Sequence, residues 1–433
     1  MFSTQQTTEP QNQPTLNATY DVIIIGAGPA GTTVAALVAE AGHDVLVLDR
    51  AAFPRFHVGE SLIPETWWTL KRLGLIEQLQ QSAFPKKLSV QFVTETDKET
   101  MPFYFDEYKD CPSSQTWQIV RSEFDEMMLK NAQQKGATAH TQAQVLDVLF
   151  ENDAAIGVQV QLQENDGTKK TCSIQSKVVV DATGQSAFLA NRLKLKTIDN
   201  RLRKGSIWSY FQGAHRDKGR DEGATIILQS EEKKSWFWYI PLSNNIVSVG
   251  CTGSMDYLFG TKNMSPEEIF FREVERCPGI KRRLESATAV AKHFTTKDFS
   301  YSTTEAAGDG WVLVGDAFGF VDPVYSSGVF LALKSGEWAA DAIVTSLKKN
   351  DLSKMSLGCW QKEYREGINL FKKLVYAFYT PDFSFGKFFK EFPQYRSNLV
   401  DILIGDVFKP GVGEMFEAMG DLQPPENIPT SFP

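Results

Sequence analysis

The chain has 433 residues, 42% of them hydrophobic, which is enough for one large domain or two domains with a sizeable core. Its formal net charge of −8 argues against a protein that binds nucleic acid broadly, because neutralising phosphates requires a basic face. The five cysteines and five histidines are scattered without the spacing of metal ligands or of a disulfide framework. We therefore expect no metal site and a reducing, cytoplasmic environment.

Both ends of the chain differ in composition from the rest. Residues 1–17 are polar and lack a basic segment followed by an apolar core, so we expect a flexible lead-in and no signal peptide. Residues 423–433 are rich in proline and predict a second flexible tail. We also expect no membrane span, since no such segment is evident.

A strand–helix–strand unit opens the remaining sequence. The apolar run 21–25 predicts a strand, residues 29–41 predict a helix, and residues 44–48 predict a second strand. A turn rich in glycine joins the first strand to the helix. This order is that of a dinucleotide-binding βαβ unit.

The glycines of the turn each have a steric reason. Gly26 would allow the tight turn, Gly28 the close approach of a pyrophosphate, and Gly31 the close packing of the helix on the sheet. Asp49, at the end of the second strand, is placed to accept hydrogen bonds from a ribose hydroxyl. These residues leave FAD and NAD(P) equally open. The cofactor-binding residues expected in this unit are Gly26, Gly28, Pro29, Ala30, Gly31, Asp49 and Arg50.

The next segment, RFHVGESLIP at residues 55–64, follows a proline loop. Apolar side chains at helical spacing predict a helix over 61–75, beginning near Gly59. The segment resembles the one that follows the first βαβ unit in flavin-dependent halogenases and related FAD monooxygenases, where it runs beside the flavin. The resemblance selects FAD over NAD(P).

A lysine pair lies in AFPKKLSVQF, residues 83–92. The segment resembles the halogenase pattern F-x-x-K-x-G-x-x-F and places Lys87 at the lysine position, with Ser89 replacing the glycine. The resemblance implies that Lys87 hydrogen-bonds hypohalous acid or carries it as a haloamine, and a lysine whose pKa is lowered by burial suits either role. Because Lys86 precedes it, the assignment between the two lysines stays open.

The chain then returns to the cofactor side. Apolar residues on one face predict a helix that ends at Gly136, residues 142–162 alternate like strands, and a buried strand ends at the DATG segment, 181–184. In the family, the arginine at the start of this helix contacts the flavin and a backbone position matching Val145 contacts the adenine. The resemblance extends these roles to Arg121 and Val145, although Arg121 alone reads equally well as an exposed helix-start residue.

A second sheet is predicted on the substrate side. The expected strands are 90–94, 101–105, 207–212, 224–229, 236–241 and 246–252. Trp236 and Trp238 belong to a W-x-W-x-I-P motif that resembles the signature of flavin-dependent halogenases. Strand alternation puts both on one face, and the resemblance implies a wall between flavin and substrate. A rival resemblance to isoprenoid reductases, with Y-x-W-x-F-P followed by glycines, is kept open by Gly250 and Gly253.

The cofactor site is completed by residues 308–347. A buried strand leads to Gly315-Asp316, which resembles the motif whose aspartate binds a ribityl hydroxyl, and a helix is predicted over 329–347. The free N–H groups at a helix start can bind anions, and the resemblance puts a halide on Ser327 and Gly328, with Gly328 and Val329 at the flavin.

Tyr325 stands where tryptophan halogenases have a glutamate. The departure favours a pyrrole, phenol or carrier-bound substrate over free tryptophan. The catalytic candidates are Lys87, Trp236, Trp238 and Tyr325.

We predict an α/β fold: a Rossmann-like FAD-binding domain of the glutathione-reductase/hydroxylase type, an inserted β-rich substrate domain and a helical C-terminus. The expected boundaries are 18–85, 115–190 and 300–347 for the FAD-binding domain, 86–114 and 191–299 for the substrate domain, and 348–422 for the helices.

The resemblance implies an FAD-dependent halogenase that uses reduced FAD, O2 and chloride or bromide on a small aromatic substrate, free or on an acyl-carrier protein. The sequence has no second glycine fingerprint for NAD(P)H, so we expect a separate flavin reductase. The alternatives are an FAD monooxygenase, an isoprenoid-type reductase, or a non-enzymatic escort protein on the same fold.

Overall fold

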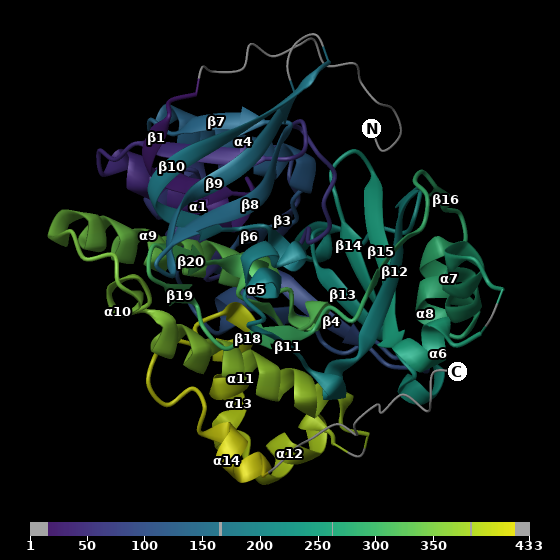
Figure 1. Cartoon of the computed structure of the whole chain (residues 1–433). Coiled ribbons are helices and arrows are strands. Elements are labelled where there is room, and N and C mark those ends of the chain that lie inside the picture. Colours follow the sequence, from purple (N-terminus) through teal and green to yellow (C-terminus); the bar gives the residue numbers. More distant parts are fainter. Residues whose placement is uncertain (1–15, 164–166, 262, 382, 421–433) are drawn as a thin grey trace.

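The computed structural model describes residues 16–163, 167–261, 263–381 and 383–420. The tail expected at 423–433, and all but the last two residues of the lead-in expected at 1–17, lie outside the described residues. Figure 1 shows two sheets side by side, with C-terminal helices packed below them.

The first sheet is largely parallel and carries the predicted βαβ unit. Its strand order is β19 (Ala307–Gly308), β20 (Trp311–Leu313), β10 (Lys169–Asp181), β1 (Thr19–Ile25), β2 (Val45–Asp49) and β7 (Thr138–Thr141). Antiparallel strands β8 (Ala143–Glu151) and β9 (Ala154–Gln163) extend it through β10. The central strands are apolar runs because helices cover the parallel sheet.

The register brings the carboxyl ends of the central strands to one edge. Ile25 pairs with Asp181 and with Leu48, and Asp181 pairs with Leu313. In open α/β sheets this edge is where ligands bind.

Helices α1 (Pro29–Glu40) and α4 (Arg121–Gln134) pack on this sheet, and α1 also packs against α4 and against α9 (Gly328–Lys349). The contact between α1 and α9 is close because Gly336 has no side chain: a Cβ there would lie 2.7 Å from the carbonyl oxygen of Ala30. This contact packs the first turn of α1 against the middle of α9.

The second sheet forms the substrate side. Its order is β16 (Thr288–Ala289), β12 (Lys204–Gln212), β15 (Ile246–Ser254), β14 (Ser235–Pro241), β13 (Thr225–Gln229), β4 (Ser89–Val93) and β5 (Phe103–Tyr104), with β17 (Phe294–Lys297) also on β12. Trp236 and Trp238 face the large core shared with the first sheet, whereas Phe237 and Tyr239 face a separate core. The predicted alternation along β14 is confirmed.

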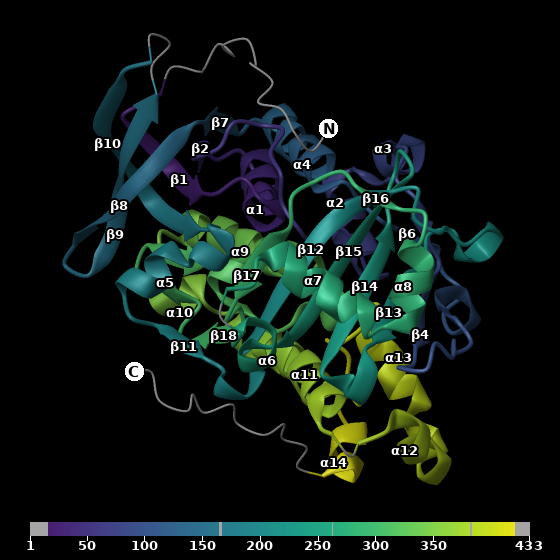
Figure 2. The same cartoon turned by 90° about the vertical axis from the view of Figure 1, so that its right-hand side faces the viewer.

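Three helices that the sequence analysis missed lie within residues 200–300. They are α6 (Met255–Phe259), α7 (Pro266–Glu275) and α8 (Pro278–Leu284). Ser265 accepts from the backbone N–H of Glu268, and the Glu268 side chain accepts from the N–H of Ser265. This capping box, with Pro266 at the first helical position, was a readable start signal for α7. Figure 2 shows α7 and α8 covering the second sheet.

The helix predicted over 61–75 is wrong at its start. Helix α2 spans Thr66–Leu73 and α3 spans Ile76–Gln81, while Ser61 forms an isolated bridge with Gln118. Leu62 also donates its N–H to the carbonyl of Trp117. The segment before α2 is therefore extended and pairs with a distant strand.

Smaller pairings join the two sides. They are β3 (Lys86–Lys87) with β6 (Thr116–Trp117), and β18 (Tyr301–Thr303) with both β11 (Lys196–Ile198) and β21 (Gly319–Phe320). A short helix, α5 (Phe188–Arg192), follows the DATG segment.

The C-terminal part is helical, as predicted. It contains α10 (Lys354–Leu357), α11 (Gln361–Tyr379), α12 (Phe385–Glu391), α13 (Arg396–Ile404) and α14 (Met415–Met419). None of the helices within the described ranges is long and apolar enough to cross a bilayer. The exact domain boundaries stay a prediction.

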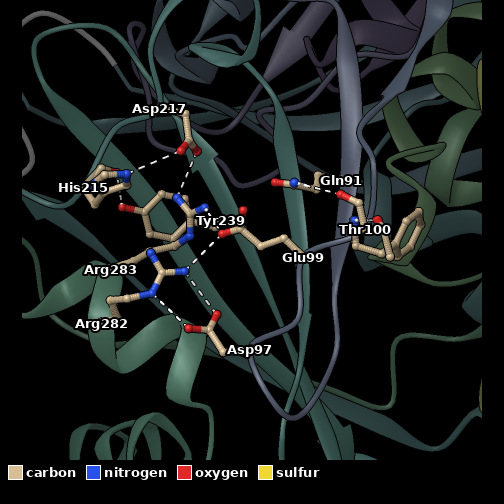
Figure 3. A network of polar contacts seen from close by, with 10 residues as sticks. Gln91, Asp97, Glu99, Thr100, His215, Asp217, Tyr239, Arg282 and Arg283 are labelled. Carbon is tan, nitrogen blue, oxygen red and sulfur yellow. Dashed lines mark hydrogen bonds and ion pairs between the residues drawn. The ribbon is translucent and has the colours of Figure 1, made fainter.

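A polar network fastens the β4–β5 connection to α8 (Figure 3). Arg283 forms ion pairs with Asp217 (2.9 Å) and Glu99 (3.2 Å). Arg282 pairs with Asp97 at 2.9 Å and with Glu99 at 3.0 Å, both in the same connection. The network is built on the face of the second sheet that α8 covers.

Candidate active site

A cavity of about 560 Å³ lies at the carboxyl edge of the parallel sheet, against the second sheet. Of the residues predicted to bind the cofactor, those lining it are Gly26, Gly28, Pro29, Ala30, Asp49, Arg50, Arg121, Val145, Asp316, Gly328 and Val329. Residues far apart in the sequence thus meet around one cavity.

The glycines of the turn differ in what surrounds them. Gly26 has φ +105°, and a Cβ there would lie 2.4 Å from the carbonyl oxygen of Ala182. Gly31 is away from the cavity, and a Cβ there would lie 2.0 Å from the Gly26 oxygen. A Cβ at Gly28 would instead meet only Arg55 Nη2, at 3.7 Å. Gly26 and Gly31 are required by the fold, whereas Gly28 keeps space open in the cavity.

The carboxylate of Asp49 lies beside this turn. It accepts hydrogen bonds from the N–H groups of Ala27 (2.8 Å) and Ala51 (2.9 Å). The guanidinium of Arg55 lies 3.7 Å from Asp49 and 3.2 Å from Asp125. Arg55 is a cavity residue that the sequence analysis did not assign, although it lies in the segment identified as running beside the flavin.

Arg121 begins α4 and supports that same segment. Its Nε and Nη2 donate to Asp125 at 2.8 and 3.1 Å, and its Nη1 donates to the carbonyl of Val58 at 2.7 Å. It is buried, which excludes the exposed helix-start interpretation. The ion pair with Asp125 favours the charged form and the pKa of Arg121 is raised, against the effect of burial.

The start of α9 faces the cavity from the other side. Ser327 is the N-cap residue and Gly328 begins the helix; Gly328 lines the cavity and Ser327 does not. The first N–H groups of a helix have no partner within it, so this end attracts anions. Burial raises the pKa of the neighbouring Asp316 to about 7, and Arg121 opposes the rise.

The tryptophan pair separates the cavity from the C-terminal helices. Trp238 lines the cavity, and its ring centre is 6.2 Å from that of Trp236, which lies behind it. Gly250 on the paired strand makes room for Trp238, because a Cβ there would lie 2.1 Å from the indole. Gly250 is therefore explained by the packing of Trp238, without reference to the resemblance to isoprenoid reductases.

Lys87 is completely buried, whereas Lys86 is exposed. The Nζ of Lys87 donates to Ser61 Oγ at 2.8 Å and to the carbonyl of Leu62 at 2.9 Å. It lies 5.7 Å from the centre of the Phe105 ring. Burial lowers the pKa of Lys87 to about 7.

A chain of hydroxyls connects Lys87 with the cavity. Ser61 Oγ is 2.8 Å from Thr225 Oγ1, and Thr225 accepts from Gln118 Nε2 at 2.8 Å. Ser61 and Thr225 line the cavity, while Lys87 lies one hydroxyl behind it. No local pattern identified Thr225 or Gln118, because they meet Ser61 only through the fold.

Glu60 is a further buried acid on the cavity wall. Tyr210 Oη donates to it, and the N–H of Gly59 donates at 3.2 Å. Burial raises the pKa of Glu60, and these hydrogen bonds oppose the rise. No motif in the sequence singled out Glu60.

Tyr325 is buried but lies outside the cavity lining. Its Oη donates to the carbonyl of Leu374 at 3.4 Å, and its ring packs edge-on against Phe378. Burial raises the pKa of Tyr325 well above its ordinary value. Both contacts are with α11, so the residue links the start of α9 to the C-terminal helices.

The cavity fits an FAD. It combines an open position at Gly28, the N-terminal ends of α1 and α9, the cation of Arg55 and the acid Asp49. Among the residues that the structure describes, no group of three His, Cys, Asp or Glu side chains could hold a metal ion.

Comparison with known sequences agrees with this geometry. The FAD binding domain family matches residues 19–348. Over 424 residues the chain is 30% identical to the 1H-pyrrole-2-carbonyl-(peptidyl-carrier protein) chlorinase of Pseudomonas fluorescens, covering 93% of each protein. It is also 30% identical to the sulochrin halogenase gedL of Aspergillus terreus, over 82% of this chain and 68% of the relative.

The fold is also similar to that of solved structures. The flavin-dependent brominase Bmp2 superposes with a TM-score of 0.82 at 28% identity, covering 93% of this chain and 98% of Bmp2. The myxobacterial chondrochloren halogenase CndH gives a TM-score of 0.78 at 31% identity, covering 92% of this chain and 96% of CndH.

Proposed function

Because the chain belongs to the flavin-dependent halogenases of the FAD binding domain family and is thus an FAD-dependent oxidoreductase, we propose that it halogenates an electron-rich aromatic substrate through hypohalous acid. The observation that carries this proposal is the completely buried Lys87, with a pKa lowered to about 7, one hydroxyl away from the cofactor cavity.

Reduced FAD, when bound, would supply with O2 the oxidising power that converts chloride or bromide to hypohalous acid. The residues that would hold it are those of the cavity: Gly28 and the start of α1 at the pyrophosphate, Asp49 at a ribose, and Asp316 at the ribityl chain. Arg55 adds a positive charge beside Gly28. Arg121 and Val145 complete the set.

Lys87 would act on the small oxidant. As an ammonium it can donate a hydrogen bond to hypohalous acid, and as a neutral amine it can form a haloamine. With a pKa of about 7 both forms are present near neutral pH. Ser61 and Leu62 hold its Nζ in place, which fixes where the oxidant would be delivered.

The halide would bind at the start of α9, on the backbone N–H groups of Ser327 and Gly328. Trp236 and Trp238 would keep the organic substrate away from the flavin, so that halide is oxidised first. The support for this assignment is that Gly328 and Trp238 line the same cavity.

The substrate is proposed to be a pyrrole or a phenol, free or attached to a carrier protein. Tyr325 is buried against α11. An apolar, aromatic surrounding suits a neutral ring better than a zwitterionic amino acid. One relative is named for a pyrrole on a peptidyl-carrier protein, another for sulochrin.

The test is an assay of purified protein with FAD, NADH, a flavin reductase and chloride or bromide on a panel of phenols and pyrroles, free and carrier-bound. We expect halogenated products by mass spectrometry, and no rapid bleaching of bound flavin by NADH without the reductase. Insertion of labelled oxygen from O2 into the ring, with or without halide, would instead identify a monooxygenase.

A further inference from the structure

A second buried polar cluster lies behind the tryptophan pair, at the end of the C-terminal helix α11. Trp236 Nε1 donates to Tyr379 Oη at 2.8 Å, and Tyr379 Oη donates to Asp322 Oδ2 at 3.1 Å. The single hydroxyl hydrogen of Tyr379 is thereby used on Asp322, and one oxygen lone pair is used by Trp236. One phenolic oxygen joins three segments of the chain.

Asp322 is buried and holds the turn that leads into α9. Its second oxygen, Oδ1, accepts from the N–H of Val324 at 2.9 Å, at the start of the turn Pro323–Tyr325. Ser326 follows with φ +55°, and Ser327 then caps α9. The position of the α9 start therefore depends on how Asp322 is fixed.

Lys204 of β12 supports the cluster from the second sheet. Its Nζ lies 4.2 Å from the centre of the Tyr379 ring, and the side chain is nearly buried. Burial raises the pKa of Asp322 to about 7, and the cation of Lys204 opposes the rise. The same cation also lies favourably against the aromatic ring. The cluster is thus anchored on the substrate sheet, the turn before α9 and the C-terminal helix.

We propose that Tyr379 is a positioning residue that sets the place of Trp236 relative to the turn at 322–327, and so controls halide affinity and the fraction of oxidant that reaches the substrate. The inference rests on the proposed function of Trp236 as part of the wall and of Ser327 as part of the halide site. Without the hydroxyl, the indole N–H of Trp236 and one oxygen of Asp322 would be left without their buried partner.

The decisive variant is Tyr379→Phe, with Tyr376→Phe as a matched control. Tyr376 lies on the same helix and also donates to a carboxylate, Asp199 Oδ2, at 2.7 Å. Within the described residues, the Asp199 side chain bonds Lys372 at 2.6 Å, Tyr376 and the N–H of Arg201, and none of these belongs to the cluster. Both changes remove one tyrosine–aspartate hydrogen bond, but only one disturbs the turn at 322–327.

We expect Tyr379→Phe to raise the halide KM by about threefold to tenfold, because the free energy of one lost hydrogen bond is the most that this change can transmit to the start of α9. The share of reduced flavin that ends as hydrogen peroxide should rise together with it, while Tyr376→Phe stays within about twofold of wild type in both. Trp236→Phe should raise peroxide release without raising the halide KM, because the Tyr379–Asp322 bond remains.

A measurement without turnover separates this inference from the proposed function. Amide hydrogen exchange at residues 322–327, followed by mass spectrometry, should be faster in Tyr379→Phe than in Tyr376→Phe. Equal exchange, with equal halide KM and equal peroxide release in the two variants, would overturn the positioning role. If exchange is faster in Tyr379→Phe but the wild-type protein makes no halogenated product, Tyr379 still positions the turn at 322–327 and the proposed halogenase function is wrong.

Discussion

Lys86 and Lys87 are neighbours on β3 but point to opposite sides of it, so the Lys87 side chain is completely buried and the Lys86 side chain is exposed. The Nζ of Lys87 donates to Ser61, a residue of the cofactor cavity wall, whereas Lys86 lines a separate surface cleft. The pair therefore offers an internal control for the role of the buried amine.

Lys87→Ala is expected to lower the rate of halogenation by a factor of about 10²–10⁴, the usual effect of losing one catalytic hydrogen bond or proton donor. Flavin binding and oxygen-dependent flavin oxidation should persist, because Lys87 does not line the cavity. Lys86→Ala should retain most activity. Product formation, flavin absorbance and oxygen uptake are measured side by side, and normal halogenation by both variants would remove the lysine from the mechanism.

The pKa of Lys87 also predicts a pH-dependent stability. Burial lowers this pKa from its ordinary 10.5 to about 7, so between these values the unfolded chain binds more protons at this lysine than the folded protein does. Stability contributed by this site therefore rises with pH across that window and is constant below it.

Lys87→Met removes the titration while filling similar space, and urea unfolding of both proteins isolates the effect. From about pH 7 to about pH 9 the wild type should gain roughly 2 kcal/mol relative to Lys87→Met. A difference that does not change over this range would mean that the folded lysine titrates near its ordinary value.

The glycines of the first turn should separate folding from cofactor binding. Gly28→Ala should fold normally, because the new Cβ meets only Arg55 at 3.7 Å and the residue has φ −78°. It should nevertheless lack flavin, since the methyl group takes the space of the pyrophosphate. Flavin absorbance and thermal unfolding of the purified variant are the two measurements, and stoichiometric flavin in Gly28→Ala would contradict the phosphate assignment.

Gly26→Ala is the contrasting variant. Its φ of +105° and the Ala182 oxygen at 2.4 Å from the new Cβ require the turn to shift. We expect a loss of at least ~2 kcal/mol in the free energy of unfolding, whether or not FAD is added. Unchanged stability would show that the turn can relax around a side chain.

The network in Figure 3 predicts unequal effects of two adjacent arginines. Arg283 is 1% exposed and bonds Asp217 and Glu99, whereas Arg282 is 47% exposed and bonds Asp97 and Glu99. Arg283→Ala should cost about 3 kcal/mol of stability and Arg282→Ala less than about 1 kcal/mol, because an exposed ion pair is screened by solvent. Denaturant unfolding compares them, and equal losses would show that burial does not decide the strength of this network.

Local patterns predicted the parts of the site that depend on neighbouring residues. The glycine turn and its strand, the α9 start after Asp316, and the alternation of Trp236 and Trp238 are set by short-range geometry. The helix predicted over 61–75 failed because its first apolar residues, Leu62 and Ile63, belong to an extended segment. That segment pairs with residues more than fifty positions away.

The contacts that place the catalytic candidates are of the same long-range kind. Ser61 meets Thr225, and Trp236 meets Tyr379, across separations of 164 and 143 residues. No periodicity or spacing in one sequence encodes such pairs. The capping box at Ser265, in contrast, was readable, and its omission made residues 200–300 look entirely β.

The residues that line the cavity extend along the sequence from Ile25 to Ala332. In the first sheet, β1 pairs with β10, and β10 pairs with β20. During translation, at about 5–20 residues per second, the first turn therefore leaves the ribosome on the order of tens of seconds before the last wall of the cavity. The complete cavity therefore forms only after α9 has been made. Until then the βαβ unit carries the Gly28 turn and Asp49 without the opposite wall of the cavity.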